Sequence, residues 1–137
     1  MAGRLSHMSN LKAHKDNSET KDSFKRKAYQ FSLKIIAIVD NLPKKRASWV
    51  ISDQILRSST SIGANIAEAK SASSRRDFIK YYEISLKSAN QTLYWLGLVR
   101  DASLIDKNSI EGLIQDCQEL CRIIAASIIT LKGKRKY

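Results

Sequence analysis

The chain has 137 residues, a formal net charge of +11, 43% hydrophobic residues, one proline and five glycines. This length fits one domain with a core of its own, and this composition excludes disordered and fibrous proteins. Because turn residues are so few, we expect a small number of long elements and an all-α protein.

The two cysteines, Cys117 and Cys121, lie four residues apart in an apolar segment. They cannot join distant segments, so we expect core thiols in a reducing, cytoplasmic setting. No apolar run approaches the ~20 residues that span a bilayer, and the pattern of a secretory signal is absent. We interpret residues 1–17 as a polar tail, of which residues 1–7 are a cloning remnant ahead of a native start at Met8.

Apolar residues recur at alternating spacings of four and three, which is the pattern of a helix with one buried side. The first such segment runs from Phe24 to Leu42 and stops before Pro43, because proline disfavours helix in the residue before it. The second runs from about Lys45 to Ser71. We expect a helix over each segment.

The third segment opens at Ser74, which forms the pattern of a capping box with Asp77. The fourth opens near Asp106, and Gly133 ends it. Strand patterns are absent. We therefore predict an antiparallel up-down-up-down four-helix bundle over residues 18–132 and a basic C-terminal tail over residues 133–137.

Groups that usually perform catalysis are scarce in the predicted bundle. His7 and His14 both precede it, which excludes a Ser-His-Asp or Cys-His arrangement there. Two thiols four residues apart supply at most two metal ligands. We therefore predict no catalytic residue, no metal and no cofactor. The enzyme alternative would use Tyr81, Tyr82 or Glu83 in a bundle pocket, with a carboxyl group of strongly raised pKa.

Positive charge is spread over the whole chain except residues 104–131, which are net acidic. On the back of the third helix, Arg76, Lys80 and Lys87 fall within about 40°, and Tyr94 continues the row. Such a row can hold phosphates and stack one base. Other candidates for contact with nucleic acid are Lys44, Lys45, Arg46, Lys134, Arg135 and Lys136.

Two functions fit this charge. The first hypothesis is a non-catalytic, oligomeric bundle that binds RNA or DNA through phosphates and is an accessory factor to a nucleic-acid enzyme. The alternative is a protein-interaction module whose basic face docks an acidic partner protein, without nucleic acid. Neither requires a membrane.

Several polar and aromatic residues flank the apolar seams of the second and third helices. Arg57 and Glu68 are eleven residues apart, about 16 Å along a helix, so they cannot pair with each other within it. The third helix is apolar or aromatic on both flanks, which favours burial against another subunit. The predicted subunit or helix interface consists of Arg57, Ser58, Ser61, Asn65, Glu68, Tyr81, Ser88 and Trp95.

The stretches around these residues resemble a known family. They are Arg57-Ser58-Ser59, Ser61-Ile62, Asn65-Ile66-Ala67-Glu68, Asp77-Phe78-Ile79, Ser88-Ala89 and Tyr94-Trp95-Leu96. Over about residues 22–131 the chain resembles the bacterial four-helix-bundle proteins encoded in intervening sequences of large-subunit ribosomal RNA genes. That family is similar to the accessory variability determinant of diversity-generating retroelements.

The resemblance implies a homopentamer. For the retroelement members it also implies a nucleic-acid-binding partner of a reverse transcriptase, whereas for the ribosomal members it implies no established activity. The chain departs from the family pattern at two positions, where Ala69 replaces a usual glycine and Gln91 replaces a usual glutamate. The second departure removes a negative charge on the third helix that could pair with Arg57.

Overall fold

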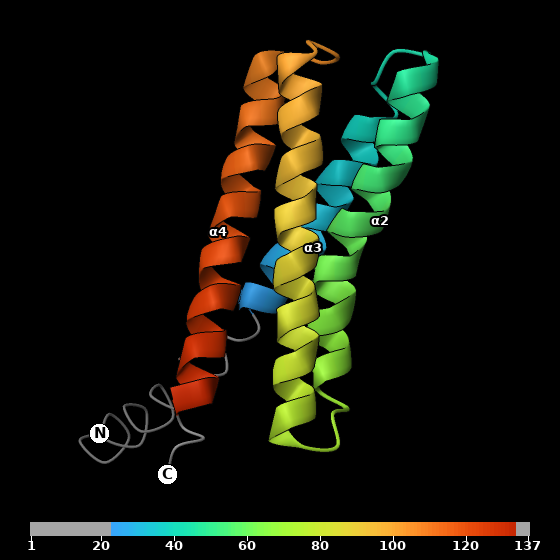
Figure 1. Ribbon diagram of the computed structural model, residues 1–137. Helices are drawn as coiled ribbons and strands as arrows, with labels where there is room; N and C mark the ends of the chain where they lie inside the picture. Colours follow the sequence, from blue (N-terminus) through green and yellow to red (C-terminus); the bar gives the residue numbers. More distant parts are fainter. Residues whose placement is uncertain (1–22, 134–137) are drawn as a thin grey trace, which may run out of the picture.

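Four long helices make up the computed structural model, which describes residues 23–133 (Figure 1). Helix covers residues 23–39, here called the N-terminal helix, Arg46–Ala69 (α2), Arg75–Asp101 (α3) and Lys107–Gly133 (α4). The described residues contain no strand. The all-α prediction of four helices is therefore confirmed. The predicted tail over residues 1–17, its remnant over 1–7, and residues 134–137 lie outside the described part.

Side chains form capping hydrogen bonds at the starts of α3 and α4. The backbone N–H of Asp77 donates to the Ser74 hydroxyl at 3.0 Å, so Ser74 caps α3 as its sequence predicts. The return bond differs from a standard capping box, because the Asp77 carboxylate accepts from the N–H of Ser73 at 3.3 Å. At the start of α4, Asp106 accepts from the N–H of Ser109 at 3.3 Å.

The helices are arranged as a square in chain order. α2 packs on α3 and α3 packs on α4, whereas α2 and α4 lie diagonally opposite. The N-terminal helix closes the square: its Ala28 faces Gly63 of α2, and its Lys27 pairs with Glu119 of α4. Links of five or six residues join the helices, so consecutive helices run antiparallel.

The core fills the space between the four helices. The largest fully buried side chains include Phe31, Ile35, Ile62, Leu96 and Ile124, one or more from each helix. Burial of each such side chain contributes about 1.5–3 kcal/mol to stability. The apolar seams of all four segments point inward, as the periodicity predicts.

The flanks of α3 differ from the sequence-based expectation. Ile79 and Ser88 are buried within this one chain, and Tyr81 and Trp95 are half-buried in it. Neighbouring helices α2 and α4 cover much of both flanks because α3 packs against both. The apolar flanks of α3 therefore do not by themselves require a second subunit.

Small hydroxyl side chains lie where α2 and α3 meet. The hydroxyls of Ser61 and Ser88 are 2.9 Å apart, and Thr92 donates to the Ser58 hydroxyl at 2.8 Å. The Asn65 amide donates to the Ser61 hydroxyl at 2.9 Å. These bonds satisfy polar groups inside the seam, so Ser58, Ser61, Asn65 and Ser88 contribute to helix pairing within the subunit.

Candidate nucleic-acid interface

The basic row on α3 is exposed along its whole length. Arg76, Lys80 and Lys87 are all exposed, and the Tyr94 side chain is 64% exposed. From Arg76 to Lys87 the row spans eleven residues, about 16 Å of helix. The Tyr94 and Trp95 rings are nearly perpendicular, with ring centroids 5.3 Å apart. The helix thus presents three cations and an aromatic ring on one side.

Two shallow grooves between α3 and α4 border this row. One, of about 660 Å³, is lined by residues that include Lys87, Asn90 and Tyr94. The other, of about 550 Å³, is lined by residues that include Arg76 and Lys80. The two grooves share Glu83 and Lys132 in their linings, and they follow one another along the row.

Lys132 of α4 is a candidate site residue that the sequence pattern did not indicate. It lines both grooves and lies 3.5 Å from the Glu83 carboxylate. α4 ends where the antiparallel α3 begins (Figure 1). Lys132 therefore lies beside three cations of α3 that are 45 or more residues earlier in the sequence. The signal was its position in the last turn of a helix predicted to lie antiparallel to α3.

The other predicted basic sites are separate from this row. Lys44 and Lys45 precede α2 and Arg46 is its first residue, and all three are exposed at the end of the bundle opposite to the start of α3. The length of α2, 24 residues or about 36 Å, separates the two sites. Lys134, Arg135 and Lys136 lie outside the described residues. The structure therefore joins Arg76, Lys80, Lys87 and Tyr94 and places Lys44–Arg46 elsewhere.

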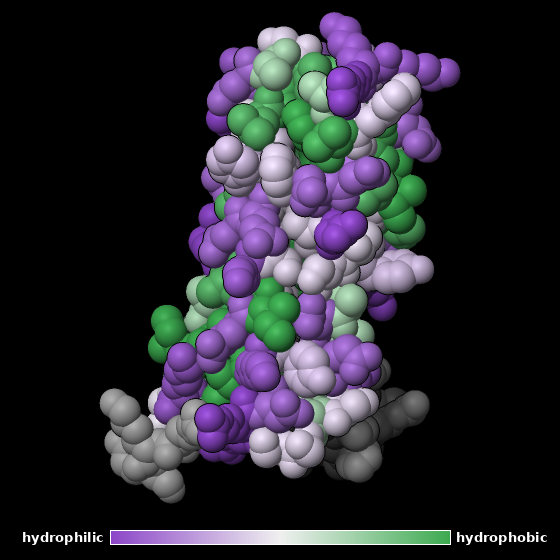
Figure 2. Space-filling model, turned by 45° about the vertical axis from the view of Figure 1, so that its right-hand side comes forward, coloured by the Kyte–Doolittle hydropathy of each residue, from purple (hydrophilic) through white to green (hydrophobic). Residues whose placement is uncertain are grey.

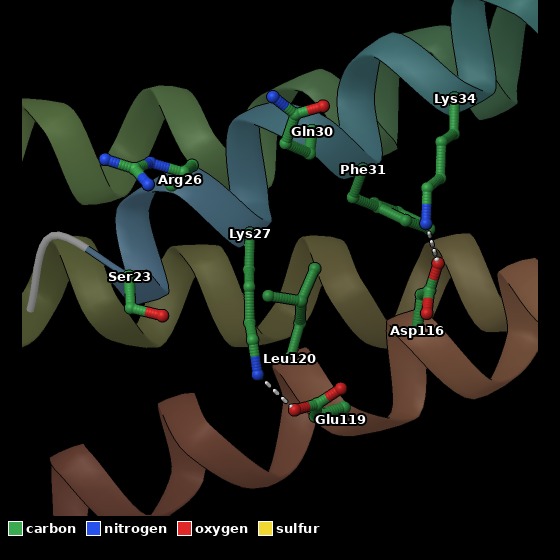
Figure 3. A pocket seen from close by; sticks show the side chains of 9 residues that line it. All are labelled: Ser23, Arg26, Lys27, Gln30, Phe31, Lys34, Asp116, Glu119 and Leu120. Atoms are coloured by element: carbon green, nitrogen blue, oxygen red, sulfur yellow. Dashed lines mark hydrogen bonds and ion pairs between the residues drawn. The ribbon is translucent and has the colours of Figure 1, made fainter. Parts of the chain in front are cut away.

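A third charged groove, of about 270 Å³, lies between the N-terminal helix and α4 (Figure 3). Lys27 points to Glu119, and Lys34 lies 2.9 Å from Asp116. The charge and hydrogen bond of Lys27 lower the pKa of Glu119. These two ion pairs join the N-terminal helix to α4. Because the carboxylates already balance both lysines, this groove is a poor site for phosphates.

Arg57 and Glu68, predicted as interface residues, are both exposed on α2. Neither side chain has an ion pair or a hydrogen bond within residues 23–133. Gln91 is exposed as well, so the glutamate that the family pattern places there is replaced by a neutral side chain. Residues 23–133 therefore give these two charges no partner.

The groups of the enzyme alternative are dispersed. Tyr82 lines a mainly apolar pocket of about 630 Å³ with Phe24, Ile66 and Phe78, and burial raises its pKa. Glu83 is absent from the lining of that pocket and pairs with Lys132 on the surface. The lining of that pocket also includes Lys25 and Lys70 and contains no carboxylate.

Both cysteines are free thiols on α4. The Cys117 thiol is buried, donates to the backbone carbonyl of Ala89 at 3.4 Å, and has its pKa raised by hydrogen bonding with Cys121 and by burial. The same thiol-thiol hydrogen bond lowers the pKa of Cys121, which is half-buried. Among residues 23–133, no three His, Cys, Asp or Glu side chains gather in a cluster able to hold a metal ion. No helix in the same range has the length and apolarity of a membrane span.

Comparison with known proteins identifies the family. The family model described as "23S rRNA-intervening sequence protein" matches residues 20–126. The chain belongs to this family. Its fold is also that of a crystal structure from Bacteroides thetaiotaomicron, described as a protein with unknown function from the S23 ribosomal protein family.

That crystal structure is 40% identical in sequence, with a TM-score of 0.72 over 77% of this chain and 97% of the other. Among curated proteins, none matches the chain. The family therefore establishes the helical fold and its relation to proteins encoded in ribosomal intervening sequences, while the function of the similar structure is itself described as unknown.

Proposed function

We propose that this protein is a non-catalytic, oligomeric bundle that binds RNA or DNA through phosphates along the grooves between α3 and α4. One observation carries the proposal: Arg76, Lys80, Lys87 and Lys132 line two adjoining grooves whose lining contains only two carboxylates, Glu83 and Asp77. Glu83 is already paired with Lys132, and Asp77 accepts from the backbone of Ser73. The surface is therefore net positive where it is hollowed.

The dimensions of the row suit a polyanion. Phosphates of one duplex strand recur every 3.4 Å along the axis, so a row of about 16 Å spans about five of them. At the end of the row, the exposed Tyr94 ring offers a stacking surface for an unpaired base. The row contains no built-in reader of base edges, so we expect weak sequence preference.

Oligomerisation strengthens such binding. Each chain carries a net charge of +11, and several copies that contact one nucleic acid bind it far more tightly than one copy does. A homopentamer, as the family resemblance implies, would present five copies of the row. In this arrangement the protein would serve as an accessory factor to a nucleic-acid enzyme, such as the reverse transcriptase of a retroelement, in a reducing cytoplasm that suits its free thiols.

A second candidate function is a protein-interaction module without nucleic acid. The observation that favours it is the set of large hydrophobic side chains exposed on the N-terminal helix and α2, including Tyr29, Leu33 and Trp49. This function predicts binding to a protein and no response to polyanions.

The deciding experiment replaces Arg76, Lys80 and Lys87 together by glutamate and measures affinity for a fluorescent 20-nucleotide RNA and its DNA equivalent. A charge-matched control replaces Lys70, Lys107 and Arg122, which are exposed elsewhere, by glutamate. We expect the first variant to lose at least tenfold in affinity and the control to lose much less, because local contact outweighs net charge. Equal losses would assign the effect to net charge alone and reject the groove as the site.

A further inference from the structure

The apolar pocket beside Tyr82 has no part in the proposed binding of nucleic acid. It has a volume of about 630 Å³ and lies at the end of the bundle where α2 and α4 end and α3 begins (Figure 1). None of its lining residues also lines either groove between α3 and α4. Its volume is in the range of sites for small organic molecules. The chemistry of its walls therefore indicates what kind of molecule it binds.

The walls of the pocket are mainly hydrophobic, and all four helices contribute to them. Phe78 stacks on Tyr82, with ring centroids 4.9 Å apart, and both rings line the pocket. The other large hydrophobic side chains of the lining are Phe24, Ile66, Ile123 and Leu131. A hydrocarbon group that enters such a pocket leaves water and packs against these side chains, which is the main favourable contribution to binding.

The charged side chains of the lining are all cations. Lys25 belongs to the N-terminal helix, Lys70 directly follows α2, and no carboxylate lines the pocket. Lys70 is exposed and has no ion pair within residues 23–133. The pocket therefore attracts an anion and repels a cation. Because a charge buried without water or a partner is costly, we expect the anionic group beside the exposed Lys70 and the hydrocarbon inside.

Tyr82 adds a hydrogen-bonding group that the fold does not use. Its side chain is only 9% exposed and lines the pocket, yet its hydroxyl forms no hydrogen bond within residues 23–133. Most buried polar groups in proteins have a hydrogen-bond partner. Burial raises the pKa of Tyr82, so the phenol keeps its proton and can donate to an oxygen atom of a ligand.

The packing of α2 on α3 places these two polar groups near each other. Ser61 and Ser88 are level along the bundle, because their hydroxyls are 2.9 Å apart. The same antiparallel register places Lys70 level with Ile79, so Tyr82 is three residues, about 5 Å, deeper in the bundle. The long side chain of Lys70 spans such a distance. One carboxylate is therefore within reach of both groups.

We propose that this pocket binds a small amphipathic anion, a single hydrocarbon chain that ends in a carboxylate, such as a medium-chain fatty acid. The carboxylate accepts from the Lys70 ammonium and the Tyr82 hydroxyl. The hydrocarbon chain follows α4 from Leu131 to Ile123, which are eight residues or about 12 Å apart. This inference goes beyond the proposed function and does not depend on nucleic-acid binding.

The test titrates the full chain with dodecanoate, below the concentration at which it forms micelles, in an isothermal titration calorimeter. Dodecyltrimethylammonium, which has the same hydrocarbon chain and a positive head group, is the matched ligand control. We expect one dodecanoate site per chain and binding of the cation that is weaker by about tenfold or more. A wild-type protein that does not bind dodecanoate, or that binds both amphiphiles equally, would overturn the inference.

Variants then distinguish the pocket from adsorption elsewhere. Figure 2 shows hydrophobic side chains near the upper end of the face that it turns forward, and Trp49 and Val50 at the start of α2 are both more than half exposed. Thr130→Trp fills the pocket from an exposed lining position, and Ile129→Trp, at a side chain 72% exposed outside the lining, is its control. Thr130→Trp should abolish binding and Ile129→Trp should preserve it. Equal affinities of these two variants would assign binding to the outer surface and reject the pocket.

Two further variants test the polar contacts. Lys70→Glu should weaken dodecanoate binding by about tenfold or more, whereas Lys107→Glu, at an exposed position at the other end of the bundle, should change it little. Tyr82→Phe keeps the ring and should weaken binding by about two- to tenfold. Circular dichroism verifies that each variant keeps its helix content. If Lys70→Glu and Tyr82→Phe both bind as the wild type does, the carboxylate is not held by these two groups and the inference fails.

Discussion

The hydroxyl of Ser85 on α3 donates a hydrogen bond to the backbone carbonyl of Ile62 on α2, at 2.8 Å. Both residues are completely buried, so two helix backbones approach closely around one small side chain. We predict that Ser85→Ala lowers the free energy of unfolding by about 1 kcal/mol, because one buried bond is lost. Ser85→Leu should cost more, about 1–3 kcal/mol or above, because the added carbons have no space. Urea unfolding measures both.

A matched control is Ser127→Ala on α4, where the hydroxyl bonds back to Ile123 of the same helix at 2.8 Å. Because α4 keeps its backbone hydrogen bonds when this hydroxyl is removed, we expect the free energy of unfolding to change by close to zero. If Ser85→Ala lowers the free energy of unfolding no more than Ser127→Ala does, the hydrogen bond between the two helices contributes nothing to stability.

Gly63 gives a prediction of the opposite sign. An added Cβ there would lie 3.7 Å from the Cβ of Ala28, which is an ordinary contact between the two helices. Gly63→Ala should therefore raise the free energy of unfolding by about 0.5–1 kcal/mol, the gain in helix propensity. Gly112→Ala, where a Cβ would meet nothing within 4 Å, is the control with the same propensity gain. Destabilisation at position 63 alone would show that the two helices leave no space for a methyl group there.

Positions with a purely local cause could be predicted from the sequence. The stop before Pro43, the cap at Ser74 and the buried seam residues each depend on neighbours within about one or two helical turns. The place of Lys132 beside the basic row could not be predicted, because it depends on which helix faces which. For the same reason Ser88 was assigned equally to a helix or a subunit interface, and only its bond to Ser61 identifies the helix.

Acid should weaken the contact between the N-terminal helix and α4. Lys27 lowers the pKa of Glu119 in the folded protein, so the ionised carboxylate stabilises the fold. This contribution is complete above the ordinary carboxyl pKa, about 4, and is lost as the pH falls through the lowered value. We expect the stability difference between wild type and Glu119→Gln to shrink from pH 6 to pH 3 in urea titrations. The difference should be small, because both side chains are nearly half exposed.

Lys27→Met provides the control for this titration. Without the lysine, only the weaker effect of the Arg122 charge still lowers the pKa of Glu119, so the stability difference from glutamine should change much less with pH. A difference that changes with pH as strongly in the Lys27→Met background would assign the acid sensitivity to another group.

The two thiols should differ in reactivity. Cys121 is half-buried and its pKa is lowered by the hydrogen bond with Cys117, so it should be alkylated by iodoacetamide in the native protein. Cys117 is buried with a raised pKa and should react only after unfolding. Mass spectrometry of the alkylated protein should show one rapid addition, at Cys121. Simultaneous modification of both residues would mean that α4 separates from α3 in the native state.

The most direct measurement of the central claim is the salt dependence of RNA binding. If Arg76, Lys80 and Lys87 each neutralise one phosphate, log affinity should fall linearly with log salt concentration, and replacing the three by glutamate should reduce the steepness by about 2–2.7. The charge-matched variant at Lys70, Lys107 and Arg122 should keep the wild-type slope. A flat wild-type slope, or one that the first variant leaves unchanged, would contradict phosphate binding at this groove.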